Sequence, residues 1–83
     1  MNIFVARLNF KTTQETLLQA FSRFGEVASA KIIIEKGTGR SKGFGFVEMP
    51  NDEEGNQAIA GLNETELDGR VIVVKPANPK TNG

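Results

Sequence analysis

The chain has 83 residues with ten basic and ten acidic side chains, so its formal net charge is zero. One domain is the most that this length accommodates, and so small a chain buries only about 60% of the surface that its unfolded form exposes. The sequence contains neither cysteine nor histidine, which excludes disulfides, thiolate nucleophiles, imidazole bases and the usual zinc ligands. We therefore expect no enzyme, no catalytic residue, no metal site and no cofactor.

The charges are unevenly distributed along the chain. Acidic residues gather at 52–54 and 64–68, whereas Lys36, Arg40 and Lys42 lie in one short segment that can make a face locally basic. A neutral chain is nevertheless not expected to hold a nucleic acid mainly through its phosphates. No apolar stretch approaches the roughly 18 residues of a membrane-spanning helix. We expect a cytoplasmic protein that does not enter a membrane.

The first third of the chain predicts a strand followed by an amphipathic helix. Residues 2–6 are β-prone, and the turn-like segment 9–13 separates them from a helical pattern. Apolar side chains recur at helical spacing in one buried stripe: Leu17, Ala20, Phe21 and Phe24. Thr12 and Glu15 have the spacing of a capping box, and Gly25 is placed to end the helix.

Two further strands are predicted in the middle of the chain. The β-branched run within residues 27–35 indicates one, a loop follows, and residues 43–49 indicate the other. The glycine-rich segment 37–43 between them invites comparison with a phosphate-binding P-loop. That motif requires Gly-Lys in this order before a helix, whereas here Lys42 precedes Gly43 and a strand follows. We reject the P-loop interpretation.

The last part of the chain predicts a second helix and a fourth strand. Pro50 ends the third strand, Asn51 or Asp52 can cap the helix, and Asp68-Gly69 is a turn signal before a strand at 71–75. The helix has a narrow apolar stripe made of Ala58, Ile59 and Leu62.

The element order is therefore β-α-β-β-α-β. It predicts an α+β, ferredoxin-like sandwich in which two helices cover one face of a four-stranded antiparallel sheet. The opposite face is left to solvent. We place one domain at residues 1–77 and a short polar tail at 78–83.

The alternation of side chains along the first and third strands predicts where the aromatic rings lie. Ile3 and Val5 share one face, so Phe4 points to the other. If Phe44 and Phe46 pointed inward, Glu48 would be buried without a partner, which is costly. We expect all three rings on the open face, where they suit planar ligands such as unstacked bases. The remaining phenylalanines are assigned to the core: Phe10, Phe21 and Phe24.

The segment Lys42–Met49 reads Lys-Gly-Phe-Gly-Phe-Val-Glu-Met. It resembles the ribonucleoprotein octamer of RNA recognition motifs and departs from it only at the last specified position. Ile3–Leu8 is similar to the companion hexamer on the first strand. The resemblance covers residues 2–77 and is strongest to the short single-motif proteins of bacteria.

The resemblance implies roles for individual residues. Phe4 and Phe46 stack bases, Phe44 packs between sugars, and Lys42 contacts a phosphate. Two departures from the family pattern bear on these expectations. Ala6-Arg7 replaces the common Gly-Asn of the hexamer, so a cation can stand in for an amide there. Met49 replaces an inward aromatic residue, for which we expect no effect on binding.

Basic residues are expected to border the rings. Alternation places Lys31 and Lys75 on the open face, and Arg7 and Lys42 lie close to it in sequence. Asn78, just past the last strand, is expected to contact a base. For these cations an ordinary solvated surface position is the alternative.

The expected function is single-stranded RNA binding through aromatic stacking, with modest affinity and little sequence preference, in RNA metabolism or translation control. Single-stranded DNA remains open as a ligand. The alternative is a protein-protein interaction module, because some members of the family bind proteins through the sheet or the helices. We expect a monomer.

Overall fold

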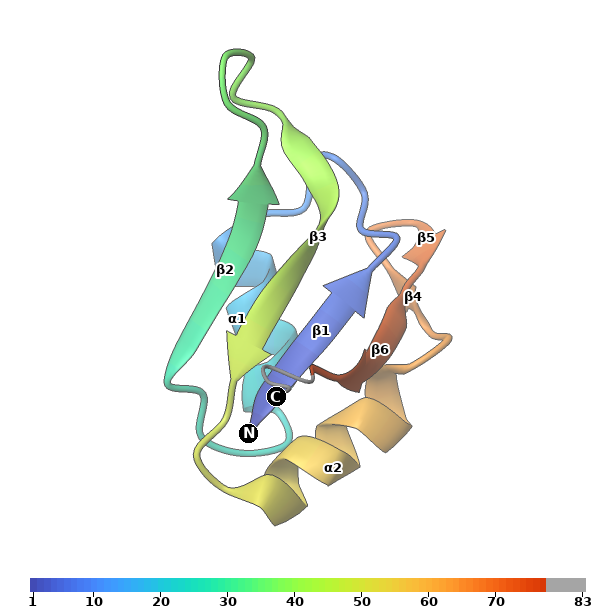
Figure 1. Ribbon diagram of the computed structural model, residues 1–83. Coiled ribbons are helices and arrows are strands. Elements are labelled where there is room, and N and C mark those ends of the chain that lie inside the picture. The colour runs from blue at the N-terminus through green and yellow to red at the C-terminus, as the bar shows by residue number, and fades with distance from the viewer. Residues whose placement is uncertain (78–83) are drawn as a thin grey trace.

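The computed structural model describes residues 1–77 and shows two layers (Figure 1). The four-stranded sheet is antiparallel with the order β2-β3-β1-β6. Its strands are β1 (Asn2–Ala6), β2 (Ser29–Ile34), β3 (Ser41–Glu48) and β6 (Val73–Pro76). The helices are α1 (Gln14–Ser22) and α2 (Asp52–Leu62), and a small hairpin is formed by β4 (Glu66–Leu67) and β5 (Arg70–Val71).

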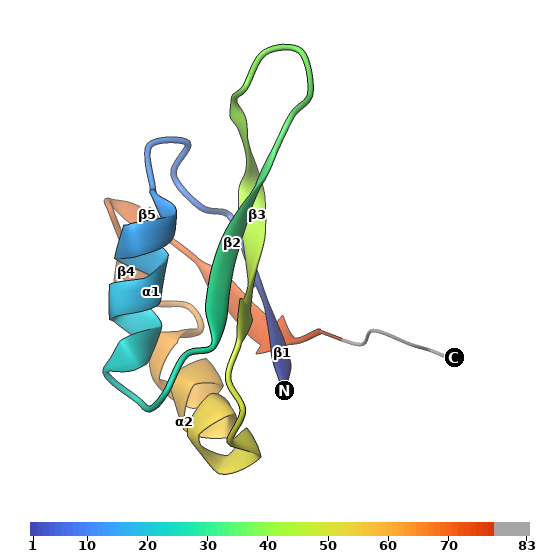
Figure 2. The ribbon, with the colours of Figure 1, turned by 90° about the vertical axis from the view of Figure 1, so that its left-hand side faces the viewer.

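Both helices lie on the same side of the sheet, and within residues 1–77 no helix covers its other face (Figure 2). The predicted α+β, ferredoxin-like architecture is confirmed, and the six main elements lie within a few residues of their expected positions. Residues 78–83, which include Asn78 and make up the predicted polar tail, lie outside the described part of the chain.

The core lies between the sheet and the helices. Phe21 and Leu17 of α1 and Ala58 of α2 are fully buried, which confirms the predicted helical stripes. The strands and the residues next to their ends contribute aliphatic side chains that are also buried: Ile3, Val5, Val47 and Val74 from the strands, with Met49 and Ile72 beside them. Because the side-chain period of a strand is two, burying these residues fixes which side chains point away from the helices.

The start of α1 differs from the sequence prediction. The N-cap is Thr13, whose Oγ1 accepts a hydrogen bond from the Thr16 amide at 3.2 Å. The predicted capping box of Thr12 and Glu15 is wrong, because the Thr12 side chain is buried and its hydroxyl donates to Asp68 Oδ2 at 2.8 Å. The helix ends at Ser22, before the predicted terminator at Gly25.

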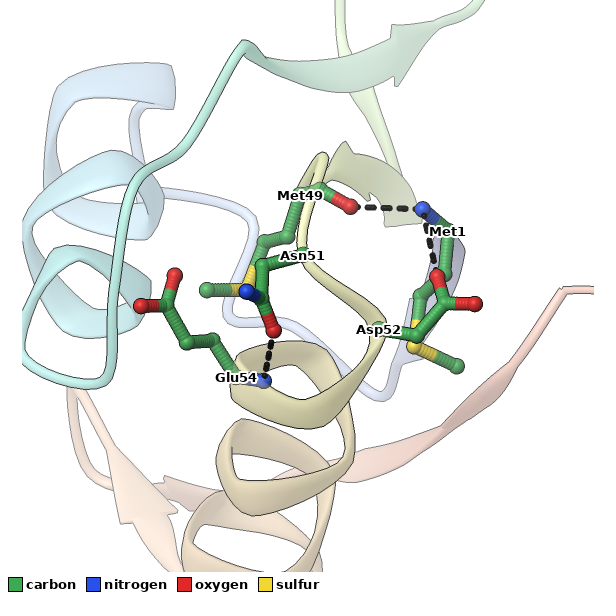
Figure 3. A network of polar contacts seen from close by, with 5 residues as sticks. All are labelled: Met1, Met49, Asn51, Asp52 and Glu54. Atoms are coloured by element: carbon green, nitrogen blue, oxygen red, sulfur yellow. Dashed lines mark hydrogen bonds and ion pairs between the residues drawn. The ribbon is translucent and has the colours of Figure 1, made fainter.

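The start of α2 is held to Met1, which directly precedes the first strand. Asn51 is the N-cap, and its Oδ1 accepts a hydrogen bond from the Glu54 amide at 3.0 Å, as Figure 3 shows. The Met49 amide donates to the Met1 carbonyl at 3.0 Å, and the Met1 amino nitrogen lies 3.4 Å from Asp52 Oδ1. These contacts fix the connection between β3 and α2 against the edge of the core.

The predicted fourth strand at 71–75 is divided in the structure. Val71 belongs to the β4–β5 hairpin, whose Asp68-Gly69 turn has positive φ angles of 52° and 83°, as a type I′ turn requires. Ile72 then leaves the sheet pattern because its amide donates to the Thr65 carbonyl at 2.9 Å. The sheet strand begins only at Val73.

We predict that Thr13→Ala lowers the free energy of unfolding by about 1 kcal/mol, because the first turn of α1 loses its side-chain acceptor. Urea unfolding followed by circular dichroism measures this effect. Thr13→Asn retains an acceptor and serves as the control, with stability close to that of the wild type. Equal stability of Thr13→Ala and the wild type would contradict the assigned cap.

Candidate nucleic-acid interface

Three phenylalanine rings form one cluster on the open face of the sheet. Phe4 and Phe46 are direct cross-strand partners on β1 and β3, and Phe44 lies opposite Ala6. The Phe4 ring centroid lies 5.5 Å from that of Phe46 and 5.8 Å from that of Phe44. Phe46 is 38% exposed and the other two rings are partly buried. The predicted outward orientation is confirmed.

The rings do not stack on one another. The planes of Phe4 and Phe46 are inclined by 51°, and those of Phe44 and Phe46 by 89°. Such tilted and edge-to-face pairs are favoured by the quadrupoles of the rings. No ring of the cluster is therefore covered by a parallel ring of its neighbours.

The glycine at position 45 brings the neighbouring strand close to the rings. A Cβ atom there would overlap the carbonyl oxygen of Lys31 on β2. A residue with a side chain would therefore require the backbones of β2 and β3 to move apart at this point. Gly45 thereby positions Lys31 beside the aromatic cluster.

The register of the sheet places two of the predicted cations in line with two of the rings. Lys31 pairs with Phe46, Phe46 with Phe4, and Phe4 with Lys75. Directly opposed residues in antiparallel strands point to the same face. The row Lys31–Phe46–Phe4–Lys75 therefore crosses all four strands of the open face, with a cation at each end.

Lys75 also contacts the aromatic cluster directly. Its Nζ atom lies over the Phe4 ring, 5.6 Å from the centroid, within the range of a cation–π interaction. Both lysines of the row are exposed at the surface. Each can reach from the ring level toward a phosphate group.

The other predicted cations have less regular surroundings. Arg7 is exposed and has a φ of 62°, so strand alternation does not determine its direction. Lys42 is exposed beside Gly43, whose φ is 86°, where the pairing of β2 and β3 shifts register. Their contacts with a ligand stay predictions, and Asn78 lies outside the described residues.

Phe10 is not a core residue, contrary to the sequence prediction. Its side chain is 68% exposed. It lies in a turn closed by a hydrogen bond of 2.9 Å from the Thr12 amide to the Asn9 carbonyl. Strand alternation ends before this turn, so the pattern that placed the other rings gives no direction for Phe10. Phe21 is fully buried and Phe24 partly, as expected for the helix stripe.

Within residues 1–77 no cluster of three or more potential metal-ligating side chains was found. The helices of this described part are too short or too polar to cross a bilayer.

A two-layer fold with exposed rings in a row on its open sheet defines a small α+β domain with a surface for planar ligands. The sequence model of the RNA recognition motif matches residues 3–73, and the chain belongs to this family. Membership agrees with the expectation that the chain is not an enzyme, because the family and the named relatives are RNA-binding domains and proteins.

Two curated relatives illustrate the similarity. A glycine-rich RNA-binding protein of Daucus carota is 46% identical over 80 residues, which cover 96% of this chain and 51% of the relative. Organelle RRM domain-containing protein 2 of Arabidopsis thaliana, a mitochondrial protein, is 46% identical over 79 residues, covering 95% and 51%. The chain thus spans about half the length of the curated relatives it matches. The resemblance to bacterial single-motif proteins stays an expectation.

Solved structures show the same fold. The crystal structure of RNA-binding protein PG1 superposes with a TM-score of 0.90 at 43% identity and covers 93% of both chains. A Sex-lethal protein–RNA complex superposes with a TM-score of 0.86 at 31% identity and covers 92% of this chain and 47% of the other.

We predict that Gly45→Ala destabilises the domain by about 1–3 kcal/mol, because the new methyl group meets the β2 backbone and the strands must separate. Replacement of a strand glycine by alanine otherwise stabilises by about 0.5–1 kcal/mol, so the sign of the change is the test. Thermal or urea unfolding measures it. A stabilised variant would show that the close approach of β2 and β3 does not exist in solution.

Proposed function

We propose that the domain binds single-stranded RNA by stacking bases on Phe4 and Phe46, while Phe44 packs against a sugar. The observation that carries this proposal is the row of two rings between two lysines. A base stacked on an aromatic side chain contributes about 1–3 kcal/mol without requiring a particular base. Two such platforms account for binding with modest affinity and little sequence preference.

The distribution of charge supports this mode of binding. Lys31 and Lys75 flank the rings, whereas the acidic residues Asp52–Glu54 lie in the first turn of α2, in the opposite layer. An approaching polyanion is therefore attracted to the open face and repelled at the start of α2. A neutral domain can in this way contact a few phosphates without a large basic surface.

The relatives favour RNA over the alternatives. The curated relatives described above include a protein named for RNA binding, and the Sex-lethal structure is a complex with RNA. Stacking alone does not separate RNA from single-stranded DNA, because both present the same ring faces. RNA specificity requires a contact with the ribose 2′-hydroxyl, and Phe44 is the residue that we propose to pack against the sugar. A role in RNA metabolism or translation control fits such a domain.

A protein-interaction module is the less supported alternative, since the names of the relatives indicate RNA. The monomeric state and the cytoplasmic location expected from the sequence stay predictions.

We predict that Phe46→Ala weakens binding to a fluorescently labelled, mixed-sequence RNA of eight nucleotides by about 5- to 150-fold, the loss expected for one stacked base. Fluorescence anisotropy measures the affinity, and circular dichroism checks the fold. Leu18→Ala is the matched control, because Leu18 is 39% exposed, similar to Phe46 at 38%, but lies on α1. Unchanged affinity of Phe46→Ala would refute the stacking mechanism.

We predict that Lys31→Gln and Lys75→Gln each weaken RNA binding and reduce its salt dependence. The affinity K falls with salt, and each lost phosphate contact makes the slope of log K against log salt concentration less steep by about 0.7 for a single strand. Titrations at several salt concentrations give the slope. Arg23→Gln removes an exposed cation at the end of α1 and is expected to leave it unchanged. If the lysine variants keep the wild-type slope, the lysines contact no phosphate.

A further inference from the structure

Glu48 is a carboxylate on the open face of the sheet that the stacking site does not explain. It is exposed, whereas its neighbours Val47 and Met49 are fully buried. Within residues 1–77 the only ion pair joins Met1 and Asp52, so no described cation lies within ion-pair distance of Glu48. A negative charge on this face opposes the approach of a polyanion. Its position beside the rings therefore indicates a contact with something other than phosphate.

Glu48 belongs to a second row of side chains that runs beside the row of rings and lysines. It pairs with Asn2 on β1 and with Ser29 on β2. These three residues, the polar row, are all exposed, and directly opposed residues share one face. Residues two apart on a strand are separated by about 6.7 Å. The polar row therefore stands one step beyond Phe46 and Phe4 on the same strands, next to a base held on either ring.

Backbone hydrogen bonds fix the polar row in place. The Glu48 carbonyl accepts a hydrogen bond from the Ala28 amide at 2.8 Å, and the Asn2 carbonyl accepts one from the Ala77 amide at 2.9 Å. The adjacent side chain of Ile3 is buried in the core. The backbone at these positions is therefore already ordered, and only side-chain freedom is lost when a ligand binds.

The charges along β3 indicate how an RNA strand lies on the sheet. Lys42 is exposed at the end of β3 that adjoins the β2–β3 hairpin, and Glu48 is exposed at the opposite end (Figure 1). The rings of Phe46 and Phe4 lie between these ends. Phosphates are attracted by the cation and repelled by the carboxylate. The RNA backbone is therefore favoured on the side of Lys42, which turns the base edges toward the polar row.

Glu48 and Asn2 together present an acceptor beside a donor. A carboxylate only accepts hydrogen bonds, whereas the amide nitrogen of Asn2 donates them. Adenine and cytosine carry an amino donor next to a ring-nitrogen acceptor on the edge that unpaired bases expose to proteins. This edge matches the pair of side chains. Uracil has no amino group, and guanine has two adjacent donors in place of the donor and acceptor.

We propose that Glu48 and Asn2 form a base-reading site for adenine or cytosine beside the stacking rings. The inference rests on the proposed RNA binding and deepens it, because it gives the sheet a base preference that stacking does not provide. Glu48 accepts a hydrogen bond from the amino group, and Asn2 donates one to the ring nitrogen. The rings hold any base, and the polar row favours an amino-bearing edge over uracil.

The test uses the full chain and labelled octauridines in which each position in turn carries adenine, cytosine, guanine or unsubstituted purine. Purine keeps the ring system and the ring nitrogen of adenine but lacks its amino group. In fluorescence anisotropy the wild type is expected to bind at least one adenine-containing strand about fivefold or more tightly than the matching purine strand. Glu48→Ala removes this difference without weakening the binding of octauridine, and Asn2→Ala reduces the preference for adenine.

Glu53→Ala is the matched control, because it removes an exposed carboxylate from the first turn of α2 in the opposite layer. This variant is expected to keep the preference for adenine over purine. Circular dichroism verifies the fold of each variant.

Equal binding of the adenine and purine strands by the wild type overturns the base-reading site. A preference for guanine over adenine overturns the pairing of Glu48 with Asn2, and a preference for adenine that persists in Glu48→Ala overturns the role of Glu48. If Phe46→Ala weakens the binding of octauridine and the wild type shows no base preference, only this inference fails. If the wild type binds none of the RNAs, the proposed function fails with it.

Discussion

Burial of one aliphatic face of the sheet is the constraint on which the rest of the structure depends. Ile3 and Val5 on β1 and Val47 on β3 are inaccessible to solvent beneath the helices. A shift of either strand by one residue would exchange its two faces and bring the phenylalanines into the core. The same packing that stabilises the domain therefore holds Phe4 and Phe46 outside it. Fold and binding surface are two results of one register.

The strand interior could be predicted from the sequence for this reason. Alternation, together with the cost of burying Glu48, gave the direction of every side chain between Phe44 and Val47, and the structure agrees. The row of two lysines and two rings could not be predicted, because it depends on which residues face each other across strands that are distant in sequence. Pairing register is set by the whole sheet.

The sequence predictions that were wrong concern positions whose structure depends on contacts with residues distant in the sequence. Thr12 and Thr13 are equally good caps by sequence, but Thr12 is engaged by Asp68, which is 56 residues away along the chain. Ile72 has strong strand propensity, yet its amide bonds Thr65 instead of a sheet neighbour. Phe10 was assigned to the core because it directly follows the first strand and could close the core at its end, but its turn carries no periodic signal. The local sequence pattern does not identify these long-range hydrogen-bond partners, Asp68 and Thr65.

The spacing of the two rings in the row has a consequence for the shape of the RNA. Their centroids are 5.5 Å apart, whereas successive bases in a helical strand rise by about 3.4 Å. Bases that occupy both rings must therefore part from each other, and a strand that keeps its helical stack cannot span them. A domain that stacks bases on both rings in the proposed way would therefore select an extended RNA strand over a folded one.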